Sequence, residues 1–290
     1  MAQGQGARPR RRGPERRQGP GLTSLTAAGV AVLREPRPAG KIGLTREAAA
    51  AWRDGRIALA GTATPPDRPA RPERPELLPP NRMKRRGYGG AAGRAALLHA
   101  LAHIELNAID LAWDIIARFA SPDLPRAFYD DWVQVAVDEA DHFDLLERLL
   151  ADLGLAYGDL PAHDGLWEAA MKTAHDLAAR LAIVPMTLEA RGCDTTPTTV
   201  LRLRRAGETT AIAALETIYH DEIRHVAAGT RWFRHVCAQR GQDAPALYHH
   251  LIRTIHRSPL KPPFNHQARA EAGMGPEFYE PVGLEAVAGH

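Results

Sequence analysis

Cysteine is scarce in this sequence of 290 residues. Cys193 and Cys237 are the two present, and neither belongs to a Cys-x-x-Cys pair. Disulfide-rich secreted folds and zinc ribbons need several cysteines at close spacing, so the sequence favours neither class. We therefore expect the protein to work in the reducing cytoplasm.

The sequence also lacks an apolar segment that would span a membrane or direct secretion. Its N-terminus is rich in Arg, Pro and Gly and has no apolar core of a signal peptide. The longest apolar stretch, residues 95–120, is interrupted by Glu105, Asp110, Asp114 and Arg118. We expect no membrane contact.

The sequence lacks a net positive charge outside its first twenty residues. That segment holds one acid, Glu15, and six arginines, which are Arg8, Arg10, Arg11, Arg12, Arg16 and Arg17. The net charge of the whole chain is +3, so the segment carries +5 and the remainder −2. A near-neutral body is not typical of a nucleic-acid binder. We predict that residues 1–21 form a disordered tail, and that any contact with nucleic acid is restricted to this arginine arm.

Residues 22–93 form a second region of mixed character. Alanine-rich runs up to about residue 59 predict one or two short helices, with Thr45 as an N-cap and Gly55 just past a helix end. Seven prolines within residues 62–80 predict an extended connector. A glycine-rich turn follows at residues 87–93.

Four long helical patterns dominate the rest of the chain. They run over residues 94–119, 126–153, 166–191 and 208–240, and the last three end at Gly154, Gly192 and Gly241. Pro185 predicts a kink in the third pattern, and a separate short helix is expected over residues 198–205. We therefore predict an all-α protein with a four-helix bundle over residues 94–241. Residues 242–290 are expected to form a mostly irregular tail packed on the bundle.

Two of these helical patterns carry the same motif. The sequence Asp-Glu-x-x-His occurs as Asp138, Glu139 and His142 and again as Asp221, Glu222 and His225. Helical positions three residues apart share a face, so each motif presents a carboxylate and an imidazole together. A single such motif is a weak signal, because surface helices often contain one.

An isolated glutamate precedes each motif on the preceding helix. Glu105 lies 34 residues before Glu139, and Glu189 lies 33 residues before Glu222. In an antiparallel helical hairpin these spacings bring both members of each pair to about the same height. Four glutamates and two histidines on four helices form the ligand set of carboxylate-bridged di-iron and di-manganese bundles. We predict that Glu105, Glu139, His142, Glu189, Glu222 and His225 bind two metal ions.

Neighbouring polar residues are candidates for a supporting role. Asp138 and Asp221 could each accept a hydrogen bond from the second nitrogen of a metal-bound histidine. Asp141 and Arg224 occupy the same slot of the two motifs and could pair across the site, although a surface salt bridge explains Asp141 equally well. The remaining histidines that we considered are expected to be structural: His99, His103, His163 and His175.

Several longer stretches resemble an uncharacterised bacterial family, a domain of unknown function within the ferritin-like superfamily. They are residues 98–105, 128–132, 157–167, 188–192 and 221–226, with Pro263–Asn265 and Ala268–Arg269 near the end. The resemblance covers roughly residues 25–275, and it implies a ferritin-like bundle with these metal ligands but no substrate. A more distant likeness, in the ligand pattern alone, is to di-iron tRNA hydroxylases.

The hypothesis that follows is an oxidoreductase with two iron ions per chain, or two manganese ions as the alternative. It would activate O₂ or peroxide to hydroxylate or oxidise an unknown small substrate, with electrons from a donor that the sequence does not name. Glu139 and Glu222 would bridge the metals, and Glu105 and Glu189 would be terminal ligands. Iron storage, ferroxidase or sensing activity and manganese-catalase-like peroxide removal remain alternatives, and a homo-oligomer remains open.

Overall fold

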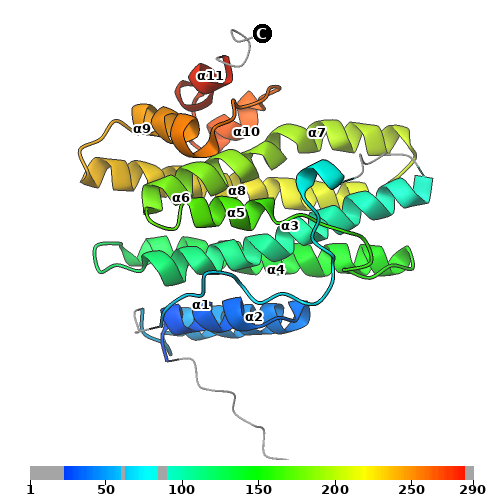
Figure 1. The fold of residues 1–290 in the computed structure, drawn as a ribbon, viewed down its shortest axis with the longest axis horizontal. Coiled ribbons are helices and arrows are strands. Elements are labelled where there is room, and N and C mark those ends of the chain that lie inside the picture. The colour runs from blue at the N-terminus through cyan, green and yellow to red at the C-terminus, as the bar shows by residue number, and fades with distance from the viewer. Residues whose placement is uncertain (1–22, 60–62, 84–89, 285–290) are drawn as a thin grey trace, which may run out of the picture.

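The regular secondary structure of the described part of the chain is helical. A computed structural model describes residues 23–59, 63–83 and 90–284. These residues form eleven α-helices, one short 3₁₀ helix (η1, Pro80–Arg82) and two π-helical segments, with no β-strand beyond isolated bridges. In Figure 1 the α1–α2 pair lies at the bottom, α3 and α4 lie above it, α7 and α8 form the next layer, and α9, α10 and α11 lie at the top. The predicted tail over residues 1–21 lies outside the described residues.

The N-terminal region contains two short helices, as the sequence predicts. They are α1 (Leu25–Arg34) and α2 (Pro38–Arg53), and Gly55 follows α2 with the positive φ of 68° expected past a helix end. The prediction that Thr45 caps a helix is wrong. Pro38 begins α2 instead, and Thr45 lies inside it, where its hydroxyl accepts a hydrogen bond of 2.9 Å from the Trp113 indole.

The longest helices of the first half are α3 (Gly90–Phe119) and α4 (Arg126–Asp152), which pack along each other. Helix α3 begins four residues earlier than predicted. It is long and apolar enough to cross a membrane by length and composition, yet 78% of its most apolar window is buried inside the molecule. Its Leu106, Ile109 and Trp113 are completely buried. Burial of this kind is that of a central core helix.

The third predicted helix is divided, and its predicted end is wrong. The chain forms α5 (Gly165–Lys172), α6 (Leu177–Ile183), the π-helix η2 (Val184–Glu189) and α7 (Ala190–Arg205). The carboxylate of Asp176 accepts hydrogen bonds from two backbone amides and starts α6 anew after a break. Gly192 has ordinary helical geometry in open space, so α7 continues through it and absorbs the helix predicted over residues 198–205.

The distortion predicted at Pro185 takes the form of the π-helix η2. Proline has no N–H to donate, which breaks the regular α-helical ladder. The Thr187 hydroxyl donates to the carbonyl of Ala182, five residues earlier, at 2.7 Å. The helix therefore continues through Pro185, and α6, η2 and α7 follow one another without a break.

The last long helix, α8 (Thr210–Gln239), matches its prediction closely, whereas the expected irregular tail does not. The chain continues as α9 (Ala244–Leu251), the π-helix η3 (Ile252–His256), α10 (His266–Glu271) and α11 (Pro276–Leu284). The side chain of Asn265 caps α10, and Phe278 and Tyr279 of α11 are buried. Proline and glycine in this region mark short turns between helices, which is why their density misled the prediction.

Candidate metal centre

The six predicted ligands come from four parts of the helical core. Glu105 lies in α3, Glu139 and His142 lie in α4, Glu189 ends η2, and Glu222 and His225 lie in α8. The contacts of α3 with α4, of α4 with α8, and of α8 with η2 bring these segments together. The two Glu-x-x-His motifs therefore face each other, and the histidine ring centroids are 6.0 Å apart.

Four of the six form a compact group that could hold a metal ion. Ligand atoms of Glu105, Glu139, His142 and Glu222 all lie within 4.8 Å of one another. Nδ1 of His142 is 3.4 Å from Oε2 of Glu139 and 3.8 Å from Oε2 of Glu105. Three of these side chains are fully buried and Glu222 is 9% exposed, so the group is shielded from solvent.

His225 and Glu189 lie next to this group. Nδ1 of His225 is 3.0 Å from Oε1 of Glu139 and 3.9 Å from Oε2 of Glu222. Glu139 thus places one oxygen toward each histidine. Glu189 is close enough to Glu139 and His225 for their charges to affect its pKa. The four-residue group does not include these two residues, but His225 lies close to Glu139 and Glu222, and Glu189 interacts electrostatically with Glu139.

Each of the two imidazoles makes a hydrogen bond to an aspartate through Nε2. Nε2 of His142 donates to Asp221 at 3.0 Å, and Nε2 of His225 donates to Asp138 at 3.2 Å. The pairing is crossed: the aspartate of each motif supports the histidine of the other, from the opposite helix. With Nε2 donating to an aspartate, each Nδ1 faces the glutamates, where it could bind a metal ion after losing its proton.

The predicted pairing of Asp141 with Arg224 is wrong. Asp141 is on the surface, where it binds Arg46 at 2.6 Å, in agreement with the simpler explanation. Arg224 instead lies over the two supporting aspartates, at 2.6 Å from Asp221 and 3.4 Å from Asp138. Arg224 lies at the surface of α8 and contacts both Asp221 of its own helix and Asp138 of α4.

Burial and mutual repulsion shift the pKa values of the glutamates in the cluster. Burial raises the pKa of Glu105 to about 8, with repulsion from Glu139 as a second cause. Burial also raises the pKa of Glu189 to about 7 and that of Glu222 well above its usual range. Glu139 behaves differently: burial opposes its ionisation, but the charge of His225 and hydrogen bonds from its neighbours hold its pKa low.

Several polar atoms of the cluster have no hydrogen-bond partner. They are Oε2 of Glu105, Oε1 of Glu139, Oε2 of Glu189, Oε2 of Glu222 and Nδ1 of His225. Of these, Oε1 of Glu139 and Nδ1 of His225 face each other at 3.0 Å. Unpaired buried polar atoms are costly, so the remaining three carboxylate oxygens call for a bound partner. All five belong to predicted ligands, and oxygen and imidazole nitrogen are donors that divalent metals accept. The cluster therefore fits a metal site.

Two supporting residues were missed by the sequence analysis. Gln134 donates to Oδ1 of Asp138 at 2.7 Å from one helical turn away, a spacing that could have revealed it. Gly229 of α8 lies against Pro185 of η2, where a Cβ atom would stand 2.6 Å from the proline Cβ. A glycine inside a helix was the only signal of that close approach.

The histidines expected to be structural stay outside the cluster. His103 contacts the Tyr157 hydroxyl at 2.9 Å and the His163 carbonyl at 3.0 Å. His99 stacks on Tyr157 and accepts a hydrogen bond from the amide of Gly158. These contacts fix the loop after α4 against α3.

Comparison with known proteins places the chain in a family. Residues 34–280 match the family described as "Protein of unknown function (DUF455)". The chain belongs to the DUF455 family. It is also 41% identical over 208 residues to an "Uncharacterized protein" of Haemophilus influenzae, which covers 70% of this chain and 72% of that protein. No solved structure matches the chain. All six candidate ligands and the supporting aspartates of this DUF455 protein lie within the matched residues.

Proposed function

We propose that α3, α4, the η2–α7 stretch and α8 form a ferritin-like four-helix bundle with a dinuclear metal centre. The crossed His–Asp pairs and the unpaired carboxylate oxygens support this proposal. Glu139 places one oxygen near each histidine, which suits a bridging ligand. Glu222 is grouped with His142 and lies 3.9 Å from His225, which suits a second bridge. Glu105 and Glu189 would then be terminal ligands.

Iron is the proposed metal, with manganese as the alternative. Carboxylates and imidazoles without thiolate suit these ions. Cys193 lies near Glu222 and Glu189, but burial raises the pKa of its thiol far above neutrality. It would remain a neutral thiol and not compete as a ligand.

The proposed activity is oxidation of a small organic substrate by O₂ or peroxide. The bound metals would supply the redox chemistry that amino-acid side chains lack. Hydroxylation with O₂ would insert one oxygen atom into a C–H bond and release the other as water, with two electrons from an external reductant. The protein's own residues would hold the ligands in place and exclude water. The buried, apolar surroundings of Glu105 and Glu139 are the observation that supports this role.

Metal content per chain tests the proposal. Protein purified anaerobically from cells supplied with iron and manganese should contain about two iron ions per chain. Glu222→Ala should lose them, while Glu216→Ala, a change at an exposed glutamate of the same helix, should retain them. The reduced iron protein should then consume O₂.

Other outcomes would redirect or refute this proposal. Two manganese ions with oxygen release from peroxide would favour the catalase-like alternative. A large hollow shell in gel filtration would favour iron storage. Absence of metal under every loading condition would contradict the metal centre and the oxidoreductase together.

A further inference from the structure

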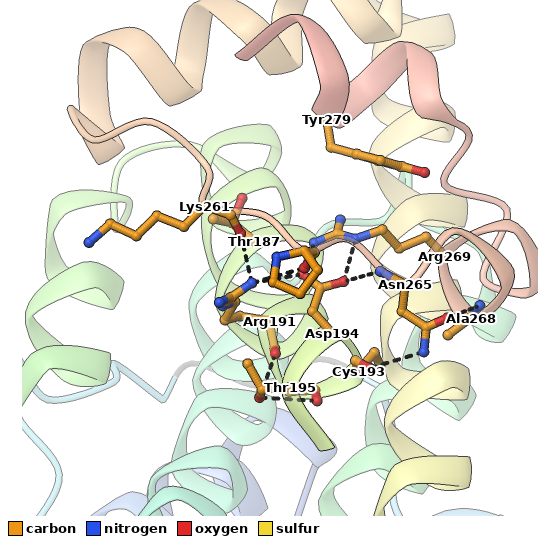
Figure 2. Close-up of polar contacts among 12 residues, drawn as sticks. Thr187, Arg191, Cys193, Asp194, Thr195, Lys261, Asn265, Ala268, Arg269 and Tyr279 are labelled. Atoms are coloured by element: carbon orange, nitrogen blue, oxygen red, sulfur yellow. Dashed lines mark hydrogen bonds and ion pairs between the residues drawn. The ribbon is translucent and has the colours of Figure 1, made fainter. Parts of the chain in front are cut away.

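A second cavity lies on the other side of the segment that carries Glu189. Its volume is about 240 Å³, and it opens between η2, the start of α7 and the chain between η3 and α10. Apolar side chains of Leu188, Leu260 and Phe264 form part of its wall. Figure 2 shows the polar contacts beside it, where the C-terminal segment crosses α7.

Positive charge exceeds negative charge around this cavity. Arg191, Lys261 and Arg269 line it, and Asp194 is its one carboxylate among the described lining residues. Asp194 is already matched by Arg269, which binds both of its oxygens at 2.9 and 2.8 Å. Both members of that pair are buried. Arg191 and Lys261 therefore leave a net positive potential at the cavity.

Arg191 is held in place before any ligand arrives. Its Nη1 donates to the carbonyls of Lys261 and Pro263 at 2.7 and 3.2 Å (Figure 2). The same nitrogen lies 3.6 Å from Asp194. A guanidinium fixed in this way loses less conformational entropy when it binds an anion.

The cavity is distinct from the candidate metal centre. Leu188 and Glu189 are consecutive in η2, but Glu189 interacts with Glu139 and His225 of the core. Leu188 and Thr187 instead line the cavity beneath the C-terminal segment. One short segment thus separates two sites of opposite charge.

We propose that this cavity binds a small organic anion with an apolar body. Its carboxylate or phosphate head would lie between Arg191 and Lys261, and its apolar part against Leu188, Leu260 and Phe264. Mostly apolar walls with a few fixed polar groups are typical of small-molecule sites. This binding function goes beyond the proposed oxidation chemistry and does not require the metals.

Calorimetric titration with hexanoate and hexyl phosphate tests the proposal on the full-length protein. Either anion should bind, and the tighter one identifies the head group. Arg191→Gln and the surface change Lys261→Gln should each weaken binding about tenfold, the cost of one charge-assisted contact. Arg204→Gln, on an exposed part of the same helix, is the matched control and should bind like the unaltered protein.

Three results would overturn the proposal. The first is no binding of either anion, or binding unchanged in both cavity variants. The second is equally tight binding of hexan-1-ol, which has no anionic head group, or of inorganic phosphate, which has no apolar body. The third is binding that depends on metal loading, which would place the ligand at the metal centre. The measurement is therefore made before and after metal loading.

Discussion

At the scale of single residues, the supporting aspartates do more than fill space near the ligands. Asp138 and Asp221 each accept a hydrogen bond from Nε2 of a histidine, which fixes the orientation of the ring. An imidazole held in this orientation could bind a metal ion through Nδ1 without first turning. The ligands therefore depend on groups that would never touch the metal.

Replacement of Asp221 by Asn should weaken metal binding by roughly 10- to 100-fold. The change keeps the size of the side chain but removes the charge that holds His142. Competition with a chelator of known affinity measures the effect. Asp141→Asn is the control, because Asp141 belongs to the neighbouring surface and binds Arg46. Equal affinities in the two variants would contradict the supporting role.

His103 should make the stability of the protein depend on pH. Burial lowers its pKa from about 6.5 to about 4, although the His163 carbonyl opposes this shift. Between about pH 4 and pH 6.5 His103 is protonated in the unfolded chain but neutral in the folded protein. The free energy of unfolding is therefore unaffected by His103 above about pH 6.5 and decreases toward pH 4.

Comparison with His103→Gln isolates this contribution. Over that window the unaltered protein should lose up to about 3 kcal/mol more stability than the variant, which cannot titrate there. Urea unfolding at a series of pH values measures the difference. Parallel pH profiles for the two proteins would contradict the assignment to His103.

At the scale of elements, η2 decides where Glu189 lies. It passes the helix-breaking Pro185 and ends at the candidate ligand Glu189, while Gly229 lets α8 approach it closely. Single π-helical turns are often found at functional sites. Glu189 has no Glu-x-x-His motif of its own, and it belongs to the candidate metal centre because η2 places it near Glu139 and His225.

Gly229→Ala should push η2 away from α8. The added Cβ would stand 2.6 Å from the Cβ of Pro185, so we expect a loss of about 1–3 kcal/mol and a lower metal content through displaced Glu189. Gly192→Ala is the matched control: open space surrounds Gly192 in α7, and alanine should stabilise the helix by about 0.5–1 kcal/mol. Thermal unfolding and metal analysis check both variants. A harmless Gly229→Ala would show that η2 does not depend on this contact.

Some features of the fold and of the ligand cluster could be predicted from the sequence, and others could not. Helical periodicity and repeated Glu-x-x-His motifs predicted α4, α8 and the meeting of Glu105, Glu139, His142 and Glu222. The ends of the third helix could not be predicted, because Gly192 is a stop signal in isolation and an ordinary helical residue in this packing. The crossed pairing of histidines and aspartates depends on the relative rotation of α4 and α8, which no local pattern encodes.

At the scale of the whole molecule, buried ion pairs connect α2 and α10 to the helices of the core. Lys41 of α2 binds Asp110 of α3 at 2.6 Å with both side chains fully buried, and Arg71 lies 3.1 Å from the same carboxylate. Asp194 and Arg269 do the same for the C-terminal helices. These pairs fix register more than they add stability, because burial of charge is itself costly.

Lys41→Met should destabilise the protein by about 3–5 kcal/mol, because it leaves Asp110 buried with one cation fewer. The double variant Lys41→Met/Asp110→Leu removes both charges of the pair. Arg71 keeps its hydrogen bond to Asn107, so the double variant should recover most of that loss. Chemical unfolding of the three proteins measures the difference. A double variant as unstable as the single one would show that the ion pair itself, rather than an unpaired charge, determines stability.

The crossed support of His142 and His225 has a consequence for any division of the chain. Helices α4 and α8 each contain a Glu-x-x-His motif, yet neither helix contains the aspartate that its own histidine binds. A substitution of Asp138 therefore acts on His225 of α8, and a substitution of Asp221 acts on His142 of α4. A chain divided between α4 and α5 would separate each of these two histidines from its aspartate.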